Sequence, residues 1–495
     1  MGGILFQYFV ATFDSTLMAS SHPVITSYFN ASNAASWLST AFLLTSTSFQ
    51  PLFGRMSDTF GRRPLYIFSL AMFSLTTLWC ALAQSIGSFI AARAVCGLGA
   101  GGVMAMGTIM INDLVPIEIR GTFQAYINIF FGLGSASGAA FGGVLCDLLG
   151  WRGAFAIQLP PIVILLVIAV FTTPSGLGPN LAKTSDKPVW RILRSFDWAG
   201  SFFLTAFVGS LILGLNLGGN IFPWSHPLVI IALCVSFLCA LILIYVESKV
   251  DRPVMPLPLL FSSPRGNMVF SNFFAQMGFN TVIFNAPLYF QAVKLDTPTM
   301  SGFRLAPPTF ALTIFGVSTG YYITYTGRLK GPQLFGALWM LLGSILLTSI
   351  WPGIPTWVVT LFIVPLSIGQ GLTFPATTIG TLAVSTKEEQ AVMTTTLSLW
   401  RSLGTVMGVA ISSLIVQNVL YTSLEEHVTG PHKQQVIELV RKSVRAIGGL
   451  PPVHQQQVMA AYEDTIRWTF SSSLFYFAVV IILLAFIKLP RLGKH

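Results

Sequence analysis

Charged residues are scarce in this sequence. Lys, Arg, Asp and Glu make up 9% of the 495 residues, against 53% hydrophobic residues, which is too little charge to cover a water-soluble enzyme with a polar surface. The 5 cysteines show no disulfide or metal-ligand spacing. No stretch has the G-x-x-x-x-G-K-[ST] order of a nucleotide-binding loop. The composition therefore argues against a soluble enzyme, a metal site and an ATP-driven pump.

Long apolar runs are what the sequence has instead. Many approach the roughly 20 residues with which a helix crosses about 30 Å of hydrocarbon. Fourteen spans are predicted, near residues 4–25, 36–53, 65–83, 86–112, 122–145, 153–171, 199–218, 227–247, 267–290, 302–325, 332–350, 356–381, 391–418 and 468–488. An even number of spans places both termini on one side. The fold class expected is an all-α polytopic membrane protein in the lipid bilayer.

Positive charge is in excess, with a formal net charge of +10. It lies mostly in the loops between spans, where it sets topology and does not imply nucleic acid. The basic loop at residues 55–63 assigns both termini to the cytoplasm. Arg120, at another span end, is interpreted as a solvated signal of the same kind. The long loop predicted at 420–466 and the glycosylation sequon at Asn30 fall on the opposite face.

A set of glycines recurs at a nearly constant offset along the chain. Gly54, Asp58, Gly61 and Arg62 recur as Gly320, Thr324, Gly327 and Arg328 (320 − 54 = 266), Gly134 and Gly138 as Gly404 and Gly408 (404 − 134 = 270), and Gly97 and Gly99 as Gly369 and Gly371 (369 − 97 = 272). Three echoes in the same order indicate two homologous halves.

The repeat and the spans together predict five segments. They are a first six-helix half at 1–172, a cytoplasmic linker at 173–198, two inserted helices at 199–250, a second linker at 251–266, and a second six-helix half at 267–495. A site between two such halves is typical of secondary transporters.

Asp14 is the acidic residue that lies near the middle of a predicted span, roughly 15 Å from either end at about 1.5 Å per residue. A charge in hydrocarbon is costly, so such a carboxylate exchanges a proton or meets a cation, or else is a structural carboxyl tied to a neighbouring helix. Arg93 in the fourth span is a cation at comparable depth. We predict that Asp14 carries a coupling proton and that Arg93 tunes it, with no cofactor besides the proton.

Polar side chains also mark the second half. Asn272, Gln276 and Asn280 stand at i, i+4 and i+8, so they share one face of the ninth span. Such a face either lines a cavity or hydrogen-bonds to another helix, and the spacing does not choose between these. Gln370 and Arg401, in later spans, are further candidates. We predict these five residues for the substrate cavity.

A loop motif carries a family resemblance. Gly54, Asp58, Gly61, Arg62 and Arg63 stand in the order G-x-x-x-D-x-x-G-R-R, which resembles the loop between the second and third helices of the major facilitator superfamily of secondary transporters. By this resemblance Asp58 and Arg62, with Asp113 at the end of the fourth span, form a charge network that latches the two halves in the outward-facing state. The whole motif is predicted to gate the cytoplasmic side.

The fifth span resembles the antiporter signature of drug and proton exchangers. Gly134, Gly138, Gly142 and Gly143 are its small residues, and glycines at this spacing let helix backbones approach closely. Ala139 stands where the signature has proline, which weakens the antiporter inference. We predict that this stretch is a close-packed hinge.

Further stretches resemble the fourteen-span drug:proton antiporter family, and within it the fungal vacuolar basic amino acid transporters, which also lack the signature proline. The resemblance to the fourteen-span family is carried by Gly150-Trp-Arg152 followed by Phe155, Gln158 and Pro160. The resemblance to the vacuolar transporters is carried by Thr47-Ser-Phe-Gln-Pro51, Arg120-Gly-Thr-Phe-Gln-Ala125, Ser137-Gly-Ala-Ala-Phe-Gly-Gly143, Gly369-Gln-Gly-Leu-Thr-Phe-Pro375 and Leu399-Trp-Arg-Ser-Leu-Gly404. The resemblance implies a functional monomer that exchanges lumenal protons for lysine, histidine or arginine at the vacuolar membrane. Efflux of toxic compounds at the plasma membrane is the alternative, and a non-transporting nutrient sensor is a third reading.

Overall fold

The computed structural model describes most of the chain as helices. The described residues are 1–29, 35–174, 176, 197–218, 222–250, 257–296, 298–430, 432–442 and 444–492. Within them the extended structure is a single isolated bridge between Gly218 and Phe222. The sequon at Asn30, most of the first predicted linker and residues 251–256 of the second lie outside the described residues.

The first group of helices runs to residue 172. It comprises α1 (Gly2–Tyr28), α2 (Ala35–Ser48), α3 (Gln50–Phe60), α4 (Arg62–Leu82), α5 (Ile86–Leu114), the 3-10 turn η2 (Ile117–Ile119), α6 (Arg120–Ala156) and α7 (Leu159–Thr172). Gly61, with φ 91°, separates α3 from α4, a backbone conformation that side chains with a Cβ rarely adopt. Ser85 caps α5 by accepting a hydrogen bond from the backbone N–H of Ser88 at 3.2 Å.

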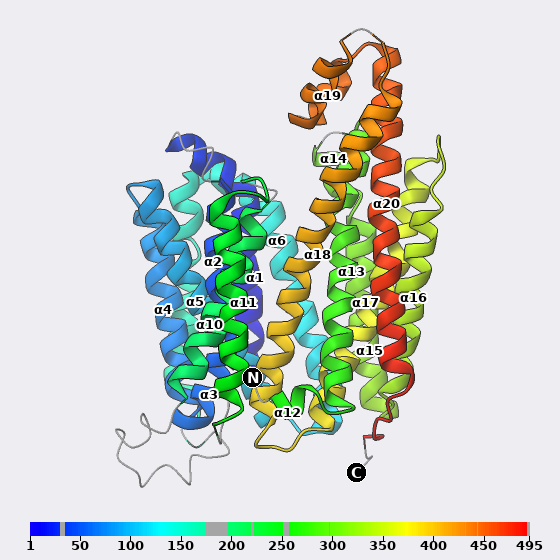
Figure 1. Cartoon of the computed structure of the whole chain (residues 1–495). Helices are drawn as coiled ribbons and strands as arrows, with labels where there is room; N and C mark the ends of the chain where they lie inside the picture. The colour runs from blue at the N-terminus through cyan, green and yellow to red at the C-terminus, as the bar shows by residue number, and fades with distance from the viewer. Residues whose placement is uncertain are drawn as a thin grey trace.

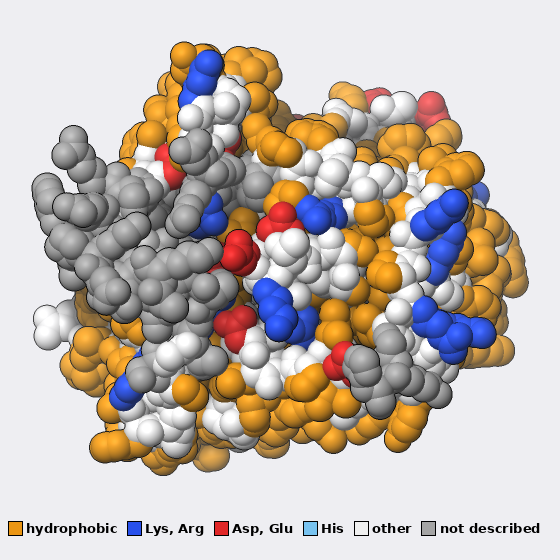
Figure 2. Space-filling model, turned by 90° about the horizontal axis from the view of Figure 1, so that it is seen from below, with side chains coloured by type: hydrophobic (Ala, Val, Ile, Leu, Met, Phe, Trp, Pro, Cys, Tyr) orange, Lys and Arg blue, Asp and Glu red, His pale blue; other side chains and the backbone are white. Residues whose placement is uncertain are grey.

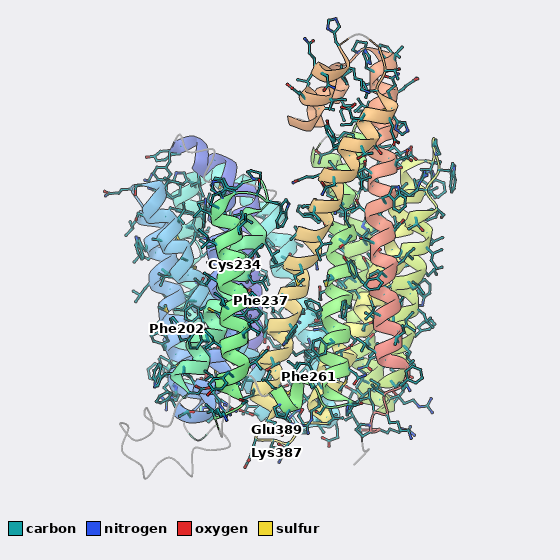
Figure 3. The ribbon with its side chains drawn as sticks, viewed as in Figure 1. Phe202, Cys234, Phe237, Phe261, Lys387 and Glu389 are labelled. Carbon is teal, nitrogen blue, oxygen red and sulfur yellow. The ribbon has the colours of Figure 1, made fainter. Side chains whose placement is uncertain are left out.

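Two helices, α10 (Trp198–Leu217) and α11 (Pro227–Glu247), follow as a pair. They pack on each other, and α10 also touches α2 and α18. Asp197 begins α10 by accepting from the N–H of Gly200 at 2.7 Å. Phe202 and Phe237 each leave 66% of their side chains exposed and point outward from this pair (Figure 3). An outward face so apolar suits lipid contact.

The second group begins after residue 256. It comprises α12 (Leu257–Leu260), α13 (Arg265–Ala292), α14 (Pro298–Phe303), α15 (Ala306–Thr326), α16 (Lys330–Thr348), α17 (Thr356–Ala383), α18 (Gln390–His427), α19 (Lys433–Lys442), the 3-10 turn η3 (Val444–Gly449) and α20 (Pro452–Ala485). The two groups stand side by side, and both chain termini lie toward the same end of the molecule (Figure 1). We refer to it below as the terminal end.

Nine helices within the described residues are long and apolar enough to cross a membrane. This supports a multi-pass membrane protein, whereas the number fourteen stays a prediction. The segment 420–466 differs from the loop expected there, because α18 continues to His427 and α20 already begins at Pro452. These two helices project beyond the bundle at the end opposite the termini, with α19 beside them (Figure 1).

Glycine contacts show the repeat in three dimensions. In each half the helix of the fifth span (α6 or α18) approaches that of the first span (α1 or α13). The approach is so close that a Cβ added to its glycines would meet backbone atoms of the first helix. Gly134 and Gly138 of α6 meet the carbonyls of Phe9 and Phe13 in α1, and Gly404 and Gly408 of α18 meet those of Phe273 and Met277 in α13. The same pair of positions therefore makes the same helix contact in both halves.

The contacts of α5 and α17, the helices of the fourth span in each half, show which residues of the two halves correspond. Gly99 of α5 lies against Phe73 of α4 and Gly101 against Ser46 of α2, while Gly369 of α17 lies against Met340 of α16 and Gly371 against Leu312 of α15. The offsets are 369 − 99 = 270 and 371 − 101 = 270, equal to the 404 − 134 = 270 of the fifth helices. The contacts thus pair Gly369 and Gly371 with Gly99 and Gly101, two residues along from the pairing suggested by sequence.

Charged side chains gather on the terminal end, where a rim of hydrophobic side chains surrounds them (Figure 2). One pair there joins the start of α13 to the turn before α18, with Arg265 Nη2 3.4 Å from Glu389 Oε2. Glu389 and Lys387 lie at this end (Figure 3). A polar cap within an apolar rim is what a membrane-embedded bundle presents to water.

Candidate functional site

Asp14 and Arg93 form an ion pair inside the first half. Arg93 Nη1 donates to Asp14 Oδ2 at 2.7 Å, and both side chains are almost completely buried, with 0% of Asp14 and 1% of Arg93 exposed. Asp14 comes from the middle of α1 and Arg93 from the second turn of α5. The two residues therefore meet directly.

The surroundings of this pair are apolar. The Arg93 guanidinium lies over the ring of Phe42, 4.4 Å from its centroid, and 5.9 Å from that of Phe155. Asp14 Oδ1 and Arg93 Nε have no hydrogen-bond partner among the described protein groups. A pair so enclosed and incompletely satisfied is costly to keep. The contacts that the structure describes for this pair all come from helices of the first half.

Arg62 organises a second charge cluster at the terminal end. It is fully buried and donates from Nη1 to Asp58 Oδ1 at 2.6 Å and to Ser57 Oγ at 2.7 Å, and from Nε to Asp113 Oδ2 at 2.8 Å. The turn at Gly61 folds α4 back on α3, so an arginine one residue later reaches the last turns of α3. The cluster ties α3, α4 and the end of α5 together.

Contacts with the second half stand next to this cluster. Gly54 of α3 lies so close to Thr395 of α18 that an added Cβ would meet its side chain. Asn112, one residue before Asp113, donates to Thr394 Oγ1 at 3.2 Å. The ion pairs themselves stay within the first half. They shape the surface on which α18 packs, and their role as a latch between the halves stays a prediction.

Two more arginines at this end bind backbone carbonyls. Arg63 Nη2 donates to the carbonyl of Val170 at 2.8 Å, which attaches α7. Arg120 donates to the carbonyls of Val115, at 3.0 Å, and of Asn112. The interpretation of Arg120 as a solvated signal is wrong, because its side chain is buried and closes the carbonyl end of α5.

The predicted hinge is the contact between α6 and α1. The oxygen of Thr12, which donates to the Tyr8 carbonyl at 2.7 Å, and that of Thr16 are the side-chain atoms nearest to Gly134 and Gly138. Gly142 is buried further along α6. The surroundings of Ala139 and Gly143 lie outside what the structure describes. Close backbone approach is confirmed at Gly134 and Gly138, and a hinge motion stays a prediction.

The polar face of α13 is partly used within the second half. Asn280 Nδ2 donates to the carbonyl of Gln276 at 2.9 Å and to Thr405 Oγ1 of α18 at 3.3 Å. Asn280 therefore joins two helices, which was one of the two readings of this face. Asn272 Nδ2 and Gln370 Oε1 are buried and have no hydrogen-bond partner among the described groups.

Arg401 of α18 stands apart from the other buried arginines. It is half-buried, and its Cζ lies 4.7 Å from the ring centroid of Phe374 in α17. Tyr8 of α1, in the other half, lies near it. The Tyr8 hydroxyl is hydrogen-bonded to Thr108 Oγ1 at 2.6 Å. Tyr8 and Thr108 were not predicted from the sequence, because hydroxyls inside apolar helices carry little signal.

No group of three or more His, Cys, Asp and Glu side chains that could hold a metal ion occurs within the described ranges. The candidate site therefore has three parts: the buried Asp14–Arg93 pair, the Arg62 cluster at the terminal end, and polar groups where the two halves meet.

Several known proteins resemble this chain in sequence or in fold. The chain is 32% identical over 468 residues to "Multidrug resistance protein fnx1" of Schizosaccharomyces pombe, covering 94% of this chain and 87% of that protein. It is 32% identical over 442 residues to "Vacuolar basic amino acid transporter 2" of Saccharomyces cerevisiae, covering 88% and 93%. The fold matches the human organic anion transporter MFSD10 with a TM-score of 0.58 over 97% of both chains, at 14% identity. Residues 4–409 match the Major Facilitator Superfamily, and this chain belongs to that family of membrane transporters.

Proposed function

We propose that the chain is a proton-coupled antiporter with fourteen membrane-spanning helices that moves basic amino acids into the fungal vacuole. The similarity to a vacuolar basic amino acid transporter over 88% of the chain supports the substrate. The proposed coupling to protons rests on one observation, the buried Asp14–Arg93 pair at 2.7 Å. Both termini face the cytoplasm in this proposal, and one chain is the working unit.

Asp14 supplies the proton site. Paired with Arg93 it is a carboxylate, since the guanidinium compensates its charge in an apolar place. When α1 and α5 move apart, the carboxyl loses that compensation and takes up a proton, because an isolated charge is very costly there. The proton then crosses with the change of state and leaves when the pair forms again.

Alternating access requires the halves to separate at one end while they close at the other. The described hydrogen bonds between the halves support closure at the terminal end. Besides the contact of Asn112 with Thr394, the N–H of Thr122 donates to Thr324 Oγ1 at 3.0 Å, and Gly121 approaches Gly320 at the same interface. In this proposal Gly54, Asp58, Gly61, Arg62, Arg63 and Asp113 hold the cytoplasmic gate in its closed form.

The test is uptake of labelled lysine, arginine and histidine into vacuolar vesicles energised by ATP, with and without the protein. Protein-dependent uptake that a proton uncoupler abolishes is expected. The Asp14→Asn variant is expected to lose it, and Glu438→Gln, which removes an exposed carboxylate of α19, to retain it. Coupled uptake that persists in Asp14→Asn would reject Asp14 as the proton carrier.

Efflux of toxic organic compounds at the plasma membrane is the second candidate. The 32% identity to a protein named for multidrug resistance, over 94% of the chain, favours it. Equal vesicle uptake with and without the protein, together with greater drug resistance of cells that carry it, would establish this alternative. A non-transporting sensor would change neither measurement.

A further inference from the structure

Arg401 lies deep in the membrane-spanning part of α18. It comes 401 − 390 = 11 residues after the start of the helix at Gln390, roughly 16 Å along the axis at about 1.5 Å per residue. With the membrane edge at the start of α18, this is about half of a hydrocarbon layer of about 30 Å. A guanidinium at this depth is costly unless it is paired or faces a water-filled path, and such residues mark substrate pathways.

The protein offers no anion to Arg401 among the residues that the structure describes. Arg62 and Arg93, the two fully buried arginines, both hold carboxylates at 2.6 to 2.8 Å. The Arg401 guanidinium forms no such ion pair and no hydrogen bond within the same residues, and its one charged or aromatic neighbour in contact is the face of Phe374. A stacked guanidinium keeps its edge, with its N–H donors, free to bind a ligand.

Groups from both halves complete the surroundings. Gln370 and Phe374 stand at i and i+4 of α17 and so share a face, and the buried Gln370 Oε1 has no described hydrogen-bond donor. Tyr8 of the other half, whose hydroxyl is hydrogen-bonded to Thr108 Oγ1 at 2.6 Å, lies near Arg401, and α18 packs on α3 and α5 of that half. Among the described residues the set comprises one unpaired cation, one unsatisfied acceptor and hydroxyls, with no carboxylate.

We propose that Arg401 binds the carboxylate of the transported solute between the two halves. A planar fork of N–H donors matches a carboxylate through two parallel hydrogen bonds. One guanidinium balances one negative charge, which fits a monocarboxylate. Gln370 Oε1 is then an acceptor for an N–H of the same solute. This inference rests on the proposed transport function and narrows it, because a neutral or purely cationic drug would leave Arg401 without a partner.

The test uses pairs of compounds that differ by a carboxylate. Binding of lysine and cadaverine, and of arginine and agmatine, is measured on the purified full-length protein in nanodiscs. Lysine is expected to bind about 10- to 100-fold more tightly than cadaverine, the range of a charge-assisted hydrogen bond. Arg401→Gln should abolish that ratio by weakening lysine alone, and Arg401→Lys should keep part of it.

Two controls keep the test decisive. Arg304→Gln removes a partly exposed arginine that pairs with Asp296 at 3.3 Å, and it should keep the wild-type ratio. Because Arg401 has no ion pair to lose, Arg401→Gln should unfold at a temperature no lower than the wild type. A wild-type protein that binds lysine and cadaverine equally, or an unchanged ratio in Arg401→Gln, would overturn the proposal.

A third pair of probes separates this inference from the substrate proposed above. Benzoate and benzyl alcohol carry no amine. Binding of benzoate that Arg401→Gln removes, in a protein that binds no basic amino acid, would support the carboxylate site and reject amino acid transport. Vesicle uptake of lysine that is unaffected by Arg401→Gln would support transport and reject the site.

Discussion

The Asp14–Arg93 pair allows a quantitative prediction, because each residue supplies the other with its charged hydrogen bond. Arg93→Met would leave a carboxylate with 0% exposure and no described donor. Removing one partner of a buried pair costs about 3–5 kcal/mol. Asp14→Asn is milder, because the amide oxygen can still accept from Arg93 and the Phe42 ring still faces the guanidinium at 4.4 Å. We expect about 1–3 kcal/mol for that variant.

The double variant Asp14→Asn with Arg93→Met is the decisive member of the cycle. Neither charge is then buried, so the loss should fall to within about 1 kcal/mol of the wild type, as for other buried pairs replaced together. The coupling energy between the two positions should then amount to several kcal/mol. Thermal and denaturant unfolding of the four purified proteins in one detergent measures it.

Proton linkage adds a second signature to the same cycle. In Arg93→Met the lone carboxyl is tolerated only in its neutral form, so the folded state binds a proton that the unfolded state releases near neutral pH. Its stability should therefore fall as pH rises from about 5 to 8 relative to the double variant, which has no carboxyl there. Additive single effects, or equal pH dependence of Arg93→Met and the double variant, would refute the buried-pair reasoning.

Three other substitutions test the remaining parts of the site. Gly404→Ala should lower stability by about 1–3 kcal/mol through overpacking against the α13 backbone, whereas Gly87→Ala, which meets nothing within 4 Å, should not, as thermal unfolding would show. Asp58→Asn leaves Arg62 with one of two carboxylates and should slow turnover about tenfold with little change in KM; an effect on KM alone would contradict a gate. Arg120→Ala frees two carbonyls and should cost about 1–3 kcal/mol, while a loss below about 0.5 kcal/mol would indicate a solvated side chain.

Hydropathy predicted the helices that lie in hydrocarbon more accurately than those outside it. The eighth span was expected at 227–247 and α11 occupies Pro227–Glu247. The projecting ends of α18 and α20 were missed, because their outer faces are polar. An amphipathic stripe does mark α19, where Val436, Ile437 and Val440 are buried in the same apolar core as Leu424 and Val458. A helical period of 3.6, which a hydropathy window averages away, is the signal there.

Part of the candidate site could be predicted from the sequence and part of it could not. Asp14 and Arg93 could be paired from sequence, because two opposite charges in neighbouring spans have few other ways to be tolerated. Arg120 was misread, because a cation that caps carbonyls at a helix end has the same sequence context as one in water. Arg401 was found as a cavity candidate, but its lack of a carboxylate partner is a property of the packed helices.

The repeat shows where the two halves depart from each other. The contacts of α6 with α1 and of α18 with α13 align Phe9 with Phe273, an offset of 273 − 9 = 264 residues. For α5 with α17, and for α6 with α18, the offset is 270 residues. Asp14 then corresponds to residue 14 + 264 = 278, and Arg93 to residue 93 + 270 = 363, which are Gly278 and Ile363. Gly278 packs on Phe477 and Ile363 is fully buried in the apolar core.

Arg401 is a charged residue of the second half whose counterpart in the first half is uncharged. Its counterpart in the first half is residue 401 − 270 = 131, Phe131. The close glycine contacts, which any rocking of the halves must preserve or exchange, are thus common to both halves, whereas each intramembrane charge belongs to one of them. If the proposals for Asp14 and Arg401 hold, the proton and the solute carboxylate are handled in different halves. Breaking of the Asp14–Arg93 pair within the first half must then be linked to the movement of one half against the other, and this is the requirement of an exchanger.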